Sequence, residues 1–254
     1  MTLGEHLEDL RRMLVHILVA VAVCAAAVFC MKERTFGLLL APKEWDFVTY
    51  RAIERLAAAL GVDFRFEPFR VDLISTELSA QFMTHLSASV ALGALLASPY
   101  ILYRLFLFVS PALYEGERRY AVPMVVSMYV LFVAGVLLSY FLLFPIAFRF
   151  LGTYQVAGEV RNVITLDSYI STFTSLTLLL GLVFQLPVVA FVLARLGLIS
   201  APFLARYRRH AVVLILIAAA VITPPDAFTL VLVSVPLWLL YEACIWIVRH
   251  AERK

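Results

Sequence analysis

The sequence is short of charge. Only 15% of its 254 residues are Asp, Glu, Lys or Arg, and 63% are hydrophobic, whereas a soluble domain carries about 25% charged residues. This deficit, together with apolar runs of helical length, places most of the chain in a lipid bilayer. The formal net charge of +3 is too small to indicate a nucleic acid as a partner.

Signatures of catalysis and metal binding are missing as well. The three cysteines, Cys24, Cys30 and Cys244, lie in apolar runs without a CxxC pair or a His/Cys cluster, which favours small buried hydrophobic residues. The sequence contains no Walker A loop, no HExxH, no GxSxG and no pair of aspartates inside an apolar run. We therefore expect neither an enzyme nor a bound metal or other cofactor.

Six apolar stretches are separated by short polar segments. They cover residues 13–31, 78–103, 120–144, 168–194, 210–222 and 227–248. No internal repeat or linker interrupts them, so residues 1–254 are expected to form one all-α integral membrane domain of six transmembrane helices. The first stretch is expected to be retained, because a charged segment follows it instead of the small residues of a signal-peptide cleavage site.

The distribution of Arg and Lys predicts the orientation of the chain. The short segments after the second, fourth and sixth stretches are basic, whereas the outer turn 223–226 has no basic residue, so both termini are expected to be cytoplasmic. Residues 32–77 then form a long outer cap loop. Within it, residues 43–60 have apolar side chains near helical spacing and predict an amphipathic helix.

The fifth stretch is short for a membrane span. Its thirteen residues, 210–222, extend about 20 Å as a helix, against a hydrocarbon core of about 30 Å. Either flanking polar side chains reach the interface and lengthen the span, or the bilayer thins locally. Both interpretations stay open.

An acidic and basic segment precedes the first span. Leucines at steps of three and four predict an amphipathic helix at the inner surface that runs into the span, with Glu8, Asp9, Arg11 and Arg12 exposed. These side chains form either a functional surface or an ordinary solvated helix face with local ion pairs.

A second acidic segment, residues 104–119, lies on the same predicted face. Glu115 and Glu117 stand beside Arg118 and Arg119. Carboxylates from the two segments could receive two guanidinium groups, because the planar fork of arginine meets a carboxylate through two parallel hydrogen bonds. Alternatively, the glutamates neutralise the neighbouring arginines.

Two further polar residues stand out near or inside the spans. Gln185 lies inside the fourth span, where Pro187 frees a backbone carbonyl near Val183. It is either a docking handle for a partner or a structural hydrogen bond between helices. Asp226 follows two prolines and is expected to cap the last helix, although an exposed acid at this turn also suits a functional contact.

These segments resemble the TatC family, the polytopic core of the twin-arginine protein translocase. The resemblance extends from His6 to about Glu242 and rests on several motifs in register. They are His6-Leu7-Glu8-Asp9-Leu10-Arg11, Ser98-Pro99, Pro111-Ala112-Leu113-Tyr114, Glu117-Arg118-Arg119, Phe144-Pro145, Phe184-Gln185-Leu186-Pro187 and Thr223-Pro224-Pro225-Asp226. One motif alone would be weak, but several in order make chance similarity improbable.

The resemblance implies a cup-shaped six-helix bundle in the inner membrane of a bacterium or archaeon. It implies a receptor for the twin-arginine signal peptides of folded cargo proteins, working in multiple copies with single-span TatA- and TatB-like subunits and driven by the proton-motive force. The alternative, a small-solute secondary transporter, usually has inverted repeats and broken helices around a midplane site, and the sequence shows neither repeat symmetry nor a charged midplane.

Site residues are also implied by the resemblance. The resemblance implies that Asp9 and Glu117 bind the arginine pair. At the position of Asp9 the family usually has glutamate. The other residues assigned to the signal-peptide site are Glu8, Arg11, Phe108, Arg118 and Arg119. Partner docking falls to Gln185, and a structural or activity-linked role falls to Pro42, Pro111, Tyr114 and Asp226.

Overall fold

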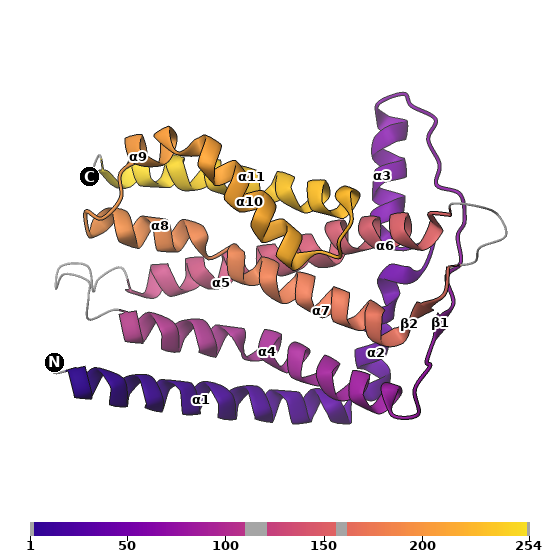
Figure 1. The fold of residues 1–254 in the computed structure, drawn as a ribbon, viewed down its shortest axis with the longest axis horizontal. Coiled ribbons are helices and arrows are strands. Elements are labelled where there is room, and N and C mark those ends of the chain that lie inside the picture. Colours follow the sequence, from indigo (N-terminus) through magenta and orange to yellow (C-terminus); the bar gives the residue numbers. More distant parts are fainter. Residues whose placement is uncertain (1–2, 110–120, 156–161, 253–254) are drawn as a thin grey trace.

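The computed structural model describes residues 3–109, 121–155 and 162–252, and in them it shows a mostly helical bundle (Figure 1). The first span, α1 (Leu3–Cys30), packs side by side with α4 (Ala80–Val109). A Cβ atom on Gly93 of α4 would lie 2.6 Å from the backbone nitrogen of Ala25 in α1. Glycine is therefore what lets these two backbones approach so closely.

Both α1 and α4 are longer than the sequence predicted. The N-terminal amphipathic segment continues into the span as one unbroken helix, so the surface helix expected before the span is not a separate element. The second span was predicted to end at residue 103, but α4 continues to Val109. Residues 104–109 are apolar except for Arg104, and nothing in them breaks a helix.

The third span continues past the proline that was predicted to end it. It consists of α5 (Ala121–Leu138), a π-helical turn η4 (Ser139–Leu143) and α6 (Phe144–Thr153). Pro145 has no N–H to donate to the carbonyl oxygen of Phe141. That oxygen instead accepts a hydrogen bond from the hydroxyl of Thr49, which lies in the outer cap.

The fourth span is broken, whereas the sequence predicted one helix over residues 168–194. Two residues separate α7 (Leu166–Val183) from α8 (Leu186–Arg195). Pro187 occupies the first turn of α8, where its missing N–H does no harm. Gln185 lies in the break itself.

The last two spans form a short hairpin. A short helix α9 (Ala201–Arg206) leads into α10 (Arg208–Ile222), which is followed by α11 (Ala227–Glu252). Five helical segments of the described chain are long and apolar enough to cross a membrane. Helix α10, which contains the short fifth stretch, is not among them. With 15 residues it extends only about 22 Å. The turn between α10 and α11 accordingly stops short of the end reached by α6 and α7 (Figure 1).

The outer segment folds against the end of the bundle opposite the two termini (Figure 1). Its elements are α2 (Lys32–Leu40), the 3-10 turn η1 (Ala41–Lys43), α3 (Val48–Ala59) and β1 (Leu73–Ile74), and β1 pairs in parallel with β2 (Ile164–Thr165). The amphipathic helix was predicted from residue 43. It begins only at Val48, because Glu44 is extended after the proline-containing turn.

An aromatic cluster joins the cap to the bundle. Phe144 and Phe148 meet the ring of Tyr169 edge to face, with centroids 5.0 and 4.9 Å apart. The buried Tyr169 hydroxyl donates to the carbonyl oxygen of Leu39 in α2 at 2.9 Å. Edge-to-face packing with a satisfied hydroxyl makes this a rigid support, so the cap is held as part of the same unit.

Candidate functional site

The candidate site lies at the end of the bundle that holds both termini, which we call the terminal end. Helix α1 begins there and α4 ends there, side by side (Figure 1). Glu8 and Asp9 are in the first turns of α1, and Phe108 lies half-buried in the last turn of α4. The fold thus brings the N-terminal acidic segment and the start of the second acidic segment to one end of the molecule.

The two adjacent carboxylates of α1 have different surroundings. One oxygen of Glu8 accepts from Arg11 at 2.9 Å and from Arg12 at 3.3 Å, which is the local pairing expected at spacings of three and four on a helix. Asp9 is exposed and has no ion pair or hydrogen bond to any side chain in the described ranges. Asp9 is therefore the carboxylate that is open to a ligand.

The second acidic segment cannot be placed in this way. Glu117, Arg118 and Arg119, and with them Pro111 and Tyr114, lie outside the described residues. The chain leaves α4 at Val109 and re-enters the bundle at Ala121 of α5, both at the terminal end (Figure 1).

The other two residues assigned to structure or activity lie far from this end. Pro42 is buried in η1 within the outer cap. Asp226 accepts from the backbone N–H of Thr229 at 2.6 Å, so the predicted cap of α11 is confirmed. Its second carboxylate oxygen is buried without a hydrogen-bond partner in the described part of the chain.

Gln185 is buried where α7 and α8 meet, with 7% of its surface exposed. Its amide nitrogen donates to the carbonyl oxygen of Met128 in α5 at 3.1 Å. The amide oxygen has no partner within the described residues. The structural hydrogen bond considered from the sequence is therefore present, and one half of the amide is left over.

Sequence reasoning missed the residues that attach the outer cap. The guanidinium carbon of Arg149 lies 4.4 Å from the ring centroid of Phe66 and 4.8 Å from that of Phe69, and its Nη2 donates to the carbonyl oxygen of Glu67 at 3.0 Å. Tyr50 completes this cage from α3. A single arginine after Pro145 and a run of phenylalanines in the cap loop were the available signals.

The cap also includes a buried phenol. The hydroxyl of Tyr50 donates to the carbonyl oxygen of Pro145 at 2.8 Å. Burial raises the pKa of Tyr50 above its ordinary value, although Arg149 works in the opposite direction. The hydroxyl is therefore a hydrogen-bond donor at any physiological pH.

A metal site would need several ligating side chains together. No group of three or more His, Cys, Asp or Glu gathers as metal ligands would within residues 3–109, 121–155 and 162–252. The chemistry offered by the terminal end is instead that of exposed carboxylates and arginines at a membrane surface.

Comparison with known proteins gives a consistent result. The family described as Sec-independent protein translocase protein (TatC) matches residues 5–236. A Sec-independent protein translocase protein TatC from Blattabacterium sp. subsp. Periplaneta americana is 33% identical over 100% of this chain and 97% of its own length. TatCy of Bacillus subtilis is 34% identical over 100% of this chain and 91% of its own length.

A solved structure agrees with these relatives. The crystal structure of a twin-arginine translocase receptor, TatC, superposes with a TM-score of 0.78 at 30% identity, covering 98% of this chain and 100% of that one. The relatives are named as components of a protein translocase, a transport function and not an enzymatic one. The chain therefore belongs to the TatC family, the multi-span membrane component of the Sec-independent, twin-arginine protein translocase.

Proposed function

We propose that this chain is the signal-peptide receptor of its translocase and that Asp9 and Glu117 bind the paired arginines of the signal peptide. The observation that carries the proposal is the state of Asp9. Its carboxylate is exposed and unpaired among the described residues, at the end of the bundle where α4 leads toward Glu117. An unpaired carboxylate at a membrane surface suits an arginine fork.

The neighbouring residues have supporting roles in this proposal. Glu8 is occupied by Arg11 and Arg12, so it shapes the charge around Asp9 without itself receiving a signal arginine. Phe108 offers apolar surface in the last turn of α4. Arg118 and Arg119 directly follow Glu117 in the sequence and are assigned to the same site.

The proposal also assigns orientation and partners. Both termini are cytoplasmic, which accords with their position at one end of a six-span bundle (Figure 1) and with the basic short segments there. Single-span TatA- and TatB-like subunits dock around the break at Gln185. Several copies of this chain assemble with them in the inner membrane of a bacterium or archaeon, and the proton-motive force drives folded cargo across.

A small-solute secondary transporter is not favoured. The relatives are translocase components, and the described spans bury no ion-pair network at their midplane; the one interhelical ion pair of the α10–α11 hairpin, Arg208 with Glu242 at 2.8 Å, is partly exposed.

The test is site-specific photo-crosslinking of an Arg-Arg signal peptide to the protein in membranes. We expect crosslinks near residues 9 and 117. The crosslinking yield should fall about tenfold or more with a Lys-Lys peptide, and also in the double variant that combines Asp9→Asn with Glu117→Gln. The reason is that hydrogen bonds to charged groups contribute about 1.5–3 kcal/mol each. Glu33→Gln is the matched control, because Glu33 is an exposed acid in the first turn of α2, beyond the far end of α1. Equal crosslinking of Arg-Arg and Lys-Lys peptides would contradict the carboxylate-fork argument.

Glu8→Gln separates the two adjacent acids. It removes a carboxylate that is already paired, so peptide crosslinking should fall much less than in Asp9→Asn alone. A larger loss in Glu8→Gln would move the binding site to Glu8.

A further inference from the structure

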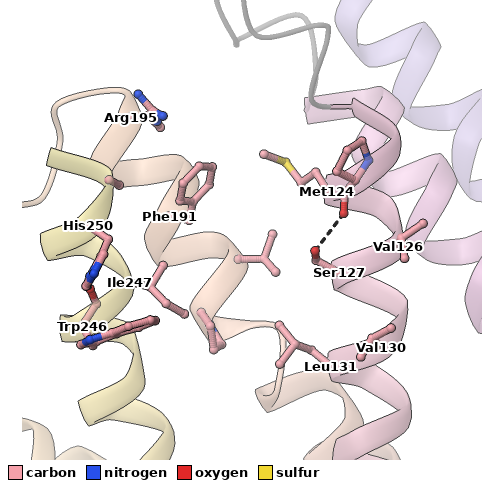
Figure 2. Close-up of a pocket in the computed structure, with 14 residues that line it drawn as sticks. Met124, Val126, Ser127, Val130, Leu131, Phe191, Arg195, Trp246, Ile247 and His250 are labelled. Carbon is pink, nitrogen blue, oxygen red and sulfur yellow. Dashed lines mark hydrogen bonds between the residues drawn. The ribbon is translucent and has the colours of Figure 1, made fainter. Parts of the chain in front are cut away.

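A groove near the terminal end of the bundle takes no part in the proposed signal-peptide site. It has a volume of about 730 Å³ and is lined by α5, α8 and α11. Figure 2 shows Arg195 at one end of this groove, with Phe191 below it and Leu131 at the other end. Trp246 and His250 come from α11, drawn in yellow. Gln185 does not line it.

The groove is polar at one end and apolar along its length. Arg195 is in the last turn of α8, and its guanidinium carbon lies 5.5 Å from the ring centroid of Phe191. His250 is near the end of α11, where its ring packs on that of Trp246 with centroids 4.2 Å apart. None of the described residues that line the groove is acidic. A ligand with one anionic end and an apolar body would match this distribution.

The groove has membrane-spanning helices for walls and an exposed indole at its edge. Three transmembrane helices form its walls, and Trp246 is 62% exposed, as suits an indole at the level of lipid headgroups. Basic pockets between transmembrane helices are a recurring form of site for anionic lipid headgroups.

We propose that this groove binds one anionic phospholipid, whose phosphate lies at Arg195 and His250 and whose acyl chain fills the space between α5, α8 and α11. The Nδ1 of His250 lies 3.1 Å from the carbonyl oxygen of Trp246 and therefore donates to it. Nε2 is left for the headgroup: it accepts from a headgroup hydroxyl when neutral and donates to the phosphate when charged. The bound lipid would contact all three helices near the terminal end.

The test uses Trp246 as a reporter in the full-length protein in nanodiscs. Trp45 and Trp238 are replaced by Phe, so that fluorescence comes from Trp246 alone. Brominated phosphatidylglycerol and brominated phosphatidylcholine, each added at low mole fraction to a bilayer of the unbrominated zwitterionic lipid, are compared as quenchers. We expect half-maximal quenching at about fivefold lower mole fraction of the anionic lipid.

Two variants decide the assignment. Arg195→Gln, His250→Gln should remove the preference for the anionic lipid, whereas Arg209→Gln, which removes an exposed arginine at the start of α10, should keep it. Native mass spectrometry of the protein with all three tryptophans should show the same loss of bound phosphatidylglycerol. Equal quenching by both lipids, or a preference that survives in the double variant, would overturn the proposal.

Other occupants give a different result. A photo-reactive residue at position 188, on the groove wall, should crosslink to lipid in native membranes. A crosslink to a second polypeptide, whether a signal peptide, a single-span subunit or another copy of this chain, would assign the groove to a protein partner and overturn the lipid site. No signal peptide is needed for the lipid measurements, so their outcome is independent of the receptor function.

Discussion

The amide nitrogen of Gln185 lies 3.1 Å from the carbonyl oxygen of Met128, and this hydrogen bond ties the break between α7 and α8 to α5. The nitrogen lies 3.4 Å from the carbonyl oxygen of Gly181 as well. The amide oxygen has no such partner in the described chain, although the side chain is buried. The donor half of the amide thus stabilises the fold, and the buried acceptor half is left over for the proposed docking role.

This division predicts different results for two substitutions of Gln185. Gln185→Leu removes donor and acceptor, so it should cost about 1 kcal/mol of stability and also weaken assembly with single-span subunits, leaving signal-peptide crosslinking largely intact. Gln185→Glu, when ionised, keeps acceptor oxygens but loses the donor, so it should lower stability and retain assembly. Thermal unfolding in detergent and co-purification of the subunits measure the two effects.

The matched control for Gln185 is Gln81→Leu, which changes an exposed glutamine near the start of α4 and should affect neither measurement. If Gln185→Leu abolished peptide binding and assembly equally, Gln185 would be a folding residue and the docking role would be lost.

Two hydroxyl groups of α3 are predicted to hold the outer cap on the bundle. Thr49 donates to the carbonyl oxygen of Phe141 and Tyr50 to that of Pro145. Thr49→Val and Tyr50→Phe should each cost about 1 kcal/mol or somewhat more, because a backbone carbonyl loses its hydrogen-bond partner. Limited proteolysis of residues 32–77 should become faster, whereas Tyr154→Phe, at an exposed ring, should leave it unchanged. Unchanged cleavage in both variants would show that packing alone holds the cap.

The raised pKa of Tyr50 predicts a pH dependence of the cap. Burial favours the neutral phenol in the folded protein, so the folded state binds the proton more tightly than the unfolded chain does. Stability is therefore fully present below the ordinary tyrosine pKa of about 10 and falls as pH rises above it. Unfolding temperatures measured from pH 8 to 11 should drop less in Tyr50→Phe than in the unchanged protein. Equal drops would show that other groups cause the loss.

Particular residues show how far the sequence could predict this molecule. Hydrophobic length predicted the spans because each follows from its own residues. Pro145 predicted the end of a helix, because a local rule sees its missing N–H. The hydroxyl of Thr49, which bonds the freed carbonyl of Phe141 from 92 residues away in sequence, cannot be seen by such a rule. The pairing of Glu8 with Arg11 follows from helical spacing and was open to prediction.

Arg149 is predicted to be irreplaceable by another cation. Its planar guanidinium stacks on the rings of Phe66 and Phe69 while one nitrogen donates to the carbonyl oxygen of Glu67. Lysine keeps the charge but lacks the flat surface and the fork. Arg149→Lys should therefore cost about 1–2 kcal/mol and release the cap loop to protease, with Arg149→Met costing at least as much. Arg65→Lys is the control, because the side chain of Arg65 is exposed. Full stability of Arg149→Lys would reduce the site to a simple charge effect.

Gly93 is predicted to set the distance between α1 and α4. A methyl group there would fall 2.6 Å from the nitrogen and 2.7 Å from the Cα of Ala25, and both are backbone atoms that cannot rotate away. Gly93→Ala must push the helices apart, so despite the higher helix propensity of alanine it should cost about 1–3 kcal/mol. Gly37→Ala meets open space in α2 and should be neutral or slightly stabilising. Because Asp9 lies at the start of α1 and Phe108 at the end of α4, Gly93→Ala should also weaken signal-peptide crosslinking, whereas Gly37→Ala should not.

A Gly93→Ala protein that unfolds at the unchanged temperature but crosslinks poorly would mean that helix spacing serves the binding site more than stability. Unchanged unfolding and crosslinking together would contradict the close approach of α1 and α4.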